Sequence, residues 1–181
     1  ESDVTLTSGA LKVEANNEVT LNLNGKKLTN QAGANTIEVA AGGTLTIEGP
    51  GTVDNVSHQK AAVNNSGTVV LNGGTYTRSQ EKGTSEEDSG SNSYYTILNH
   101  GAGKFSSLIE NGWYNGNNNT GGELSVMTIN GGTFSGGLNT IKNDDYGELT
   151  IKGGTFSSYA QACLLNWNVA TVEGGTFEGK D

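Results

Sequence analysis

The chain has 181 residues, about the length of one domain, and an acidic composition with a formal net charge of -9. Only ten residues are Lys or Arg, which disfavours a nucleic-acid partner because phosphate binding requires clustered basic side chains. No apolar run approaches the roughly 20 residues of a membrane span, so we expect no membrane insertion. Cys163 is the single cysteine and cannot form an intrachain disulfide; its apolar neighbours predict a small core residue.

A four-residue motif recurs along the chain. Three copies read Gly-Gly-Thr-Phe and one reads Gly-Gly-Thr-Tyr, and they begin at residues 73, 131, 153 and 174. The last three begin 22 and 21 residues apart (153 − 131 and 174 − 153). A fixed period of this length indicates stacked repeats, each a strand, a Gly-Gly corner, a second strand and a polar turn. The sequence therefore predicts an all-β fold, a right-handed, single-stranded parallel β-helix (a solenoid) of about eight coils in one domain, residues 1–181.

In chain order, alternating apolar and polar residues predict the first coils within residues 4–28, 36–51 and 61–76. The pattern then breaks at an acidic, polar stretch, residues 79–93, which we interpret as a loop extruded from one corner. We expect the coil to resume at residues 95–99.

Two further details complete this assignment. Asn111-Gly112 takes the position of the Gly pair in the following coil, and a second, shorter protrusion covers residues 115–122.

Inward-facing residues of successive coils should stack in columns, because side chains alternate along a strand. One column is expected to be aromatic and buried: Tyr76, Tyr114, Phe134, Phe156 and Phe177. Lys142 and Lys152 are expected to be exposed.

A column of asparagines is predicted at one turn, where amide side chains can hydrogen-bond from layer to layer. Its members are Asn64, Asn99, Asn143 and Asn166. We interpret this column as a structural device without a role in function.

These features resemble the pectate-lyase-like, right-handed β-helix superfamily. The Gly-Gly-Thr-Phe/Tyr copies and the VTLNLNGKKL stretch (residues 19–28) are more closely similar to Gly-Gly-Thr-Phe repeat domains of large secreted or wall-anchored proteins of Gram-positive bacteria. The resemblance covers nearly the whole chain. It implies an extracellular location, secreted or anchored to the cell wall, and a domain that is a fragment of a larger surface protein.

The enzymes of that superfamily provide a test for catalysis. Its pectate lyases use an acidic Ca²⁺ cluster with a basic residue, and its polygalacturonases use aspartates with a His and an Arg-x-Lys element. Here Arg78 is the only arginine, so no Arg-x-Lys occurs, and the polygalacturonase-like pieces around His100 and Asp144-Asp145 stand in the reverse order. We therefore expect a non-catalytic protein. The alternative is a polysaccharide lyase or glycoside hydrolase with an atypical active site.

Metal binding is a second possible function. Repeats that bind Ca²⁺ carry an Asp at a regular place after the glycines, whereas Thr and Phe follow them here. The acidic groups at residues 86–88 and 144–145 could hold one cation, but a solvated acidic loop is the simpler interpretation. We expect no metal and no cofactor.

A binding surface is the third possibility, and it is the function that we favour. An exposed Trp offers a flat apolar face and an N–H donor, which suit a sugar ring or a protein partner. The candidate ligand-binding residues are Trp113, Trp167, His100, Asp144 and Asp145. Adhesion or carbohydrate binding, with a glycan or a host or cell-surface protein as partner, is the expected function. Two simpler roles stay open: the Trp side chains could cover corners of the helix, and the chain could act as a spacer.

The ends of the predicted helix are the last feature. No amphipathic helix is available to close either opening, so Phe177 and Val172 should be partly exposed or should pack against another copy. We expect the C-terminal coil to be covered by further sequence of the parent protein, and end-to-end self-association is one of the two outcomes for the isolated chain.

Overall fold

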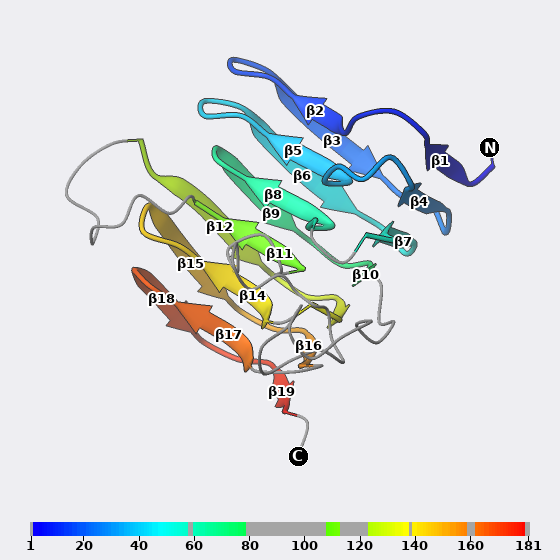
Figure 1. The fold of residues 1–181 in the computed structure, drawn as a ribbon. Helices are drawn as coiled ribbons and strands as arrows, with labels where there is room; N and C mark the ends of the chain where they lie inside the picture. The colour runs from blue at the N-terminus through cyan, green and yellow to red at the C-terminus, as the bar shows by residue number, and fades with distance from the viewer. Residues whose placement is uncertain are drawn as a thin grey trace, which may run out of the picture.

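The computed structural model describes residues 2–57, 60–78, 108–112, 123–137, 139–158 and 162–179. These residues form strands and turns, and none of them belongs to a helix that could cross a membrane. The strands make three parallel sheets, here named A, B and C, and the chain passes through them in that order in every coil (Figure 1). The predicted parallel β-helix is thereby confirmed.

The sheets are built from strands that recur three elements apart along the chain. Sheet A contains β1 (Val4–Leu6), β4 (Lys27–Asn30), β7 (Thr52–Asn55), β10 (Thr75–Arg78), β13 (Thr133–Ser135), β16 (Thr155–Ser157) and β19 (Thr176–Glu178). Sheet B contains β2 (Leu11–Val13), β5 (Ile37–Val39), β8 (Val63–Asn65), β11 (Ile109–Asn111), β14 (Asn139–Asn143) and β17 (Ala162–Asn166). Sheet C contains β3 (Glu18–Asn22), β6 (Thr44–Glu48), β9 (Thr68–Leu71), β12 (Ser125–Ile129), β15 (Gly147–Ile151) and β18 (Val169–Val172).

The number of coils is smaller than predicted. Sheets B and C have six strands each and sheet A has seven, so the described chain makes six coils and begins a seventh with β19. The expectation of about eight coils was wrong because residues 79–124 add less to the described stack than expected. They contribute a single described strand, β11.

The second glycine of each Gly-Gly-Thr-Phe copy fixes the corner between sheets C and A. Gly132, Gly154 and Gly175 have φ angles of 123°, 119° and 120°, a backbone region that residues other than glycine rarely adopt. A Cβ atom on Gly154 would lie 3.1 Å from the carbonyl oxygen of Gly132 in the preceding coil. The motif therefore marks a place where stacked backbones approach too closely for a side chain.

The residue after each Gly-Gly-Thr forms the predicted aromatic column in sheet A. The rings of Tyr76, Phe134, Phe156 and Phe177 stack with centroids 4.7, 4.7 and 4.8 Å apart, close to the spacing of the strands. The first three are fully buried, whereas Phe177 in the last strand is 40% exposed. Tyr76 stacks directly on Phe134, so no further ring lies between them; Tyr114 itself is outside the described residues.

The asparagine ladder exists, but two of its predicted members were wrong or untested. Hydrogen bonds of 2.8, 2.9 and 2.7 Å between side-chain amides join four inward-facing residues of sheet B. These are Asn65, Asn111, Asn143 and Asn166. Asn64 is one residue out of register and faces outward, and Asn99 lies outside the described residues. Each ladder amide also bonds to a backbone carbonyl, so the corner between sheets B and C is held along the axis of the solenoid.

The fourth coil (β10, β11 and β12) differs most from its predicted course. β11 pairs with β8 on one side and β14 on the other, so no strand from residues 95–99 lies between them in sheet B. Asn111 consequently belongs to the asparagine ladder, and Asn111-Gly112 does not take the place of the Gly pair. The predicted protrusions, residues 79–93 and 115–122, lie outside the described residues.

Candidate binding face

One lateral face of the solenoid carries the predicted binding residues that the structure describes. We call it the B face, and it consists of the outward-facing column of sheet B and the first residue of the turn that follows. The outward column is Lys12, Glu38, Asn64, Glu110, Lys142 and Leu165. The turn column is Glu14, Ala40, Ser66, Gly112, Asp144 and Trp167, and from Ala40 onward each backbone N–H donates to the preceding coil.

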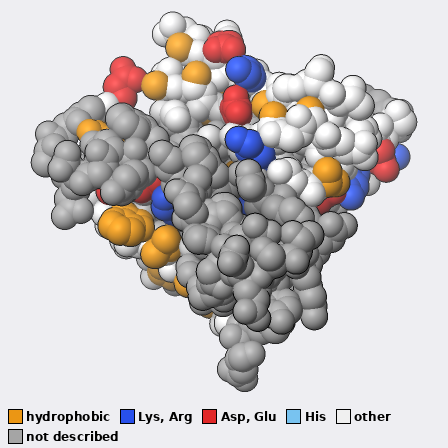
Figure 2. Space-filling model, viewed as in Figure 1, with side chains coloured by type: hydrophobic (Ala, Val, Ile, Leu, Met, Phe, Trp, Pro, Cys, Tyr) orange, Lys and Arg blue, Asp and Glu red, His pale blue; other side chains and the backbone are white. Residues whose placement is uncertain are grey.

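The B face of the first three coils is open and polar. A groove of about 270 Å³ lies there, and its lining includes Lys12, Glu14, Glu38, Ala40, Asn64 and Ser66. Lys12 Nζ lies 3.7 Å from Glu38 Oε2, and both side chains remain solvated, at 58% and 35% exposed. In the space-filling view, acidic and basic side chains intermingle over these N-terminal coils (Figure 2). The groove therefore offers both positively and negatively charged hydrogen-bonding groups to a polar ligand.

The same face is buried at the fifth coil. Lys142 Nζ lies 2.9 Å from Asp144 Oδ2, with only 6% and 0% of the two side chains exposed. This contact is an ion pair, and Asp144 Oδ1 accepts from the N–H of Asp145 at 3.1 Å. The prediction that Lys142 is exposed was wrong, although Lys152 is exposed as expected. Lys142 does face outward, and it is the surroundings of that face that exclude solvent.

Glu110 and Asp145 extend this buried charged cluster. Glu110 stands beside Lys142 in the neighbouring coil, and both acidic residues are less than 5% exposed. Burial of charge is costly unless the charges are paired. The cluster therefore depends on mutual neutralisation, which Lys142 supplies for Asp144.

Trp167 brings an apolar surface to the next coil of the same column. The backbone N–H of Trp167 donates to the backbone carbonyl of Asn143 at 2.8 Å, which places Trp167 one coil beyond Asp144. The side chain is 49% exposed, and hydrophobic side chains gather on the surface near these C-terminal coils in Figure 2. The turn thus presents an indole from a position that the backbone ladder fixes.

Three of the five predicted site residues are therefore neighbours. Asp144 and Asp145 are buried, Trp167 is half exposed beside them, and Trp113 and His100 lie outside the described residues.

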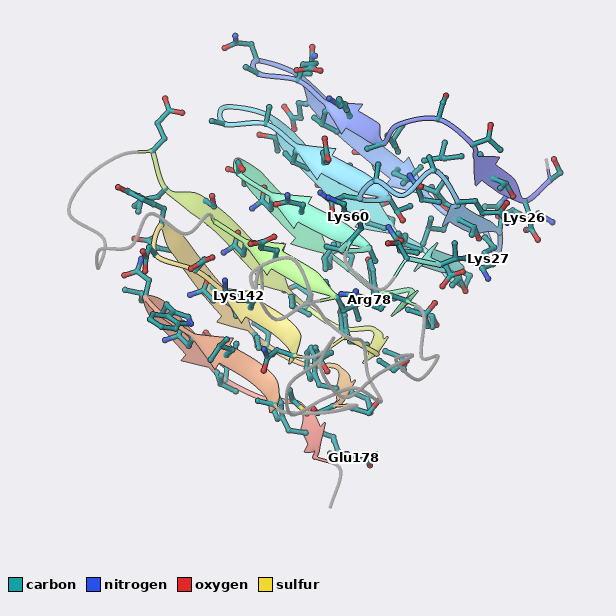
Figure 3. All side chains as sticks on the ribbon, viewed as in Figure 1. Lys26, Lys27, Lys60, Arg78, Lys142 and Glu178 are labelled. Atoms are coloured by element: carbon teal, nitrogen blue, oxygen red, sulfur yellow. The ribbon has the colours of Figure 1, made fainter. Side chains whose placement is uncertain are left out.

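Arg78 is a buried residue whose burial was not predicted from the sequence. It ends β10 beside Asn55 of the preceding coil, and its stem passes over Gly136 of the next, where an added Cβ would lie 3.1 Å from Arg78 Cγ (Figure 3). The side chain is 3% exposed, and its three guanidinium nitrogens make no hydrogen bond. Burial lowers the pKa of Arg78 to about 9. Its internal position could have been predicted from the sequence, because Arg78 aligns with Asn30 and Asn55 in the repeat.

Metal ligation and thiol chemistry find little support in the described part of the chain. There, no group of three or more His, Cys, Asp or Glu side chains could hold a metal ion. Cys163 is buried in β17, as predicted, and its sulfur lies 3.3 Å from the carbonyl oxygen of Phe156. Burial raises the pKa of this thiol, which keeps it in the unreactive form.

In comparisons with protein-family models, with curated proteins and with solved structures, the chain matches none of them. The site must therefore be interpreted from its own geometry.

Proposed function

We propose that this protein is a non-catalytic extracellular domain of a bacterial surface protein that binds glycans or acts as an adhesin through the B face. We further propose, from its Gly-Gly-Thr-Phe motifs, that it belongs to the repeat domains of secreted or wall-anchored proteins, within the pectate-lyase-like superfamily. Its partners are a glycan or a host or cell-surface protein.

The observation that carries this proposal is the half-exposed Trp167 on a turn of a rigid ladder. An indole offers a flat apolar surface to the face of a sugar ring and loses little conformational entropy on binding. The polar groove of about 270 Å³ on the same face adds carboxylate, amide, hydroxyl and ammonium groups. Such a mixture of an aromatic platform and polar groups is typical of sites that hold a ligand in place.

The acidic pair gives further support for a role without catalysis. A glycosidase needs two carboxyl groups about 5–9.5 Å apart that flank an accessible bond. Asp144 and Asp145 are adjacent in sequence, both are at most 1% exposed, and Asp144 is paired with Lys142. They are better suited to fixing the turn before Trp167 than to attacking a substrate.

A glycan-array screen of the chain, followed by titration calorimetry on the best ligand, tests the proposal. Trp167→Ala should weaken binding at least about tenfold, and Trp167→Phe should retain part of it. Leu124→Ala, at a 40% exposed apolar residue, is the matched control and should leave binding unchanged. Binding that is insensitive to Trp167→Ala contradicts the proposed site.

Incubation with uronic-acid polymers, with and without Ca²⁺, tests the alternative of a lyase or hydrolase. New reducing ends or unsaturated products that disappear in Asp144→Ala or His100→Ala would replace the proposed function by catalysis.

A further inference from the structure

The groove on the B face of the first three coils is unevenly charged. Its lining includes one ammonium group, that of Lys12, and two carboxylates, those of Glu14 and Glu38. The chain as a whole carries a formal net charge of -9. A field of this sign repels anionic ligands from the groove and attracts cationic ones.

The carboxylate of Glu38 is held in place. Its Oε1 accepts a hydrogen bond of 3.0 Å from the side-chain amide of Asn35, and its Oε2 lies 3.7 Å from Lys12 Nζ. The ammonium group of Lys12 therefore compensates the charge of Glu38. A carboxylate that is already oriented loses little conformational entropy when it accepts a further hydrogen bond from a ligand.

The carboxylate of Glu14 has no such compensation. The side chain is exposed, and within the part of the chain that the structure describes it makes neither an ion pair nor a hydrogen bond. Lys12 pairs with Glu38 across β2 and β5, so Glu14 is offset from Glu38 by one coil and two residues. Such diagonal neighbours lie about 7–8 Å apart, within reach of long side chains. Both carboxylates can therefore contact one cationic group of a ligand.

Small residues of the turn column leave room for that ligand. Ala40 and Ser66 occupy the positions that carry Asp144 and Trp167 in later coils. The resulting groove of about 270 Å³ is close to the smallest volumes of small-molecule sites, about 300 Å³. Its lining also includes the amide of Asn64 and the hydroxyl of Ser66. The groove thus combines an acidic centre with neutral polar groups in a space suited to one sugar residue.

We propose that this groove binds an amino sugar whose amine is free and protonated, within a glycan chain. The ammonium group donates charge-assisted hydrogen bonds to Glu14 and Glu38, and the ring hydroxyls bond with Asn64 and Ser66. This inference rests on the proposed function in glycan binding and assigns the class of glycan, a polymer that contains deacetylated amino sugars.

Two related classes of sugar fit the groove less well. An N-acetylated amino sugar has a neutral amide in place of the ammonium group, so it leaves the charge of Glu14 uncompensated. A uronic acid adds a third carboxylate to a groove with a single ammonium group, and like charges at close range are repulsive. The charge of the groove therefore separates three sugars of similar size.

Titration calorimetry on the chain with short oligomers of equal length tests this order. The probes are oligomers of glucosamine, N-acetylglucosamine and galacturonic acid. The glucosamine oligomer should bind about tenfold more tightly than the N-acetylated one, and the galacturonic acid oligomer should bind most weakly. Added sodium chloride should reduce the preference, because the groups of the groove remain solvated. Equal affinity for the glucosamine and N-acetylglucosamine oligomers overturns the inference.

A charge-removing substitution locates the ammonium group. Glu14→Gln keeps the shape of the side chain and should weaken binding of the glucosamine oligomer roughly three- to tenfold. Glu18→Gln is the matched control, at an exposed residue of β3 outside the groove lining, and should leave binding unchanged. An equal loss in both variants indicates attraction to the overall charge of the chain and contradicts a site in the groove.

A substitution that fills the groove provides a test without any change of charge. Ala40→Leu should weaken binding of the glucosamine oligomer at least about tenfold, because its side chain occupies the space of the sugar ring. Circular dichroism checks that the variant folds, and Asn64→Leu serves the same purpose if Ala40→Leu does not fold. Undiminished binding to a folded variant overturns the inference.

Failure of this inference and failure of the proposed function give different results. Glycans that bind through Trp167 with no preference for a free amine overturn the inference alone. If no oligomer and no glycan of the array binds, both are overturned. A lysine-rich peptide that binds to the groove while the glucosamine oligomer does not would assign the groove to a protein partner, which also overturns the inference.

Discussion

The first two coils and the fifth coil place charged side chains, Lys12, Glu38 and Lys142, at the same register of sheet B, yet they do so in different surroundings. Lys12 and Glu38 form a loose, solvated pair, whereas Lys142 and Asp144 form a close pair from which water is excluded. The period of a strand decides on which side a residue lies. It does not decide whether that side meets solvent, and the energetic weight of a charge depends on the second property.

A second contrast lies at the corner between sheets A and B. Asn55 ends β7 and donates to the carbonyl oxygens of Ala34 and Ala61, while its oxygen accepts from the N–H of Ser57. Arg78, its neighbour in the next coil, is equally internal but leaves its guanidinium nitrogens without hydrogen bonds. One column therefore holds a satisfied amide and an unsatisfied cation.

The largest effect is expected from breaking the buried ion pair. Asp144→Ala should lower the free energy of unfolding by about 3–5 kcal/mol, because it removes the carboxylate paired with the buried ammonium group of Lys142. Urea unfolding followed by circular dichroism measures this loss. Replacing both partners, Lys142→Met with Asp144→Leu, should recover much of it. A loss below about 1 kcal/mol for Asp144→Ala would show that this part of the B face is solvated.

Arg78→Asn is expected to act in the opposite direction. It removes a buried, unsatisfied guanidinium and restores the residue type of Asn30 and Asn55, so the free energy of unfolding should rise by about 1–3 kcal/mol. Asn55→Ala is the matched control in the same column and should be destabilising, because it leaves one buried and one part-buried carbonyl oxygen without this donor. A destabilised Arg78→Asn variant means that the arginine has a favourable role at this corner.

The gain from Arg78→Asn should depend on pH. Burial lowers the pKa of Arg78 to about 9 in the folded chain, well below its ordinary value, so above pH 9 the unfolded chain binds more protons. The penalty of burying the cation is complete below pH 9 and declines as the pH rises. The stability difference between variant and parent, measured from pH 7 to 11, should be constant at first and then shrink. A difference that grows above pH 9 has the wrong sign for a buried cation.

The smallest effect is expected in the open coils. Lys12→Ala breaks a 3.7 Å pair between side chains that remain 58% and 35% exposed, and should change stability by only about 0–1 kcal/mol. The same urea titration measures it, and added salt should reduce it further. A loss comparable to that of Asp144→Ala would remove the distinction between the two parts of the B face.

The fold could be predicted because its corners are repeated in the sequence. The second glycine of each pair has a positive φ and lies close to the preceding coil, so the spacing of the pairs predicts the register of sheet A from Tyr76 through Phe177. Prediction failed where an insertion separated the copies. Across residues 79–108 no motif counts the coils, so Asn111 was assigned to the wrong corner. Asn64 was chosen for the ladder in place of Asn65 for a separate reason, because two asparagines are adjacent at that turn.

The candidate site was less predictable for a different reason. Alternation correctly placed Lys142 on the outer side of its strand and Trp167 on the turn column. Exposure of a residue on an outer face depends on whatever packs over it from distant sequence, and the strand itself carries no signal for this. Arg78 was ambiguous in the same way, because a lone arginine at a strand end is ordinarily a surface residue.

The asparagine ladder has a consequence for how freely this chain can change in length. Asn65 and Asn111 are 46 residues apart and are joined by one side-chain hydrogen bond. Asn143 and Asn166, which are 23 residues apart, are joined in the same way. Doubling the length of a flexible loop costs only about 0.6 kcal/mol in closure entropy. One hydrogen bond contributes about 0.5–1.5 kcal/mol, enough to offset that cost. The asparagine ladder therefore tolerates long sequence insertions between two successive asparagines. The fourth coil is accordingly a place where evolution, or a protein engineer, can exchange sequence while the strands remain stacked.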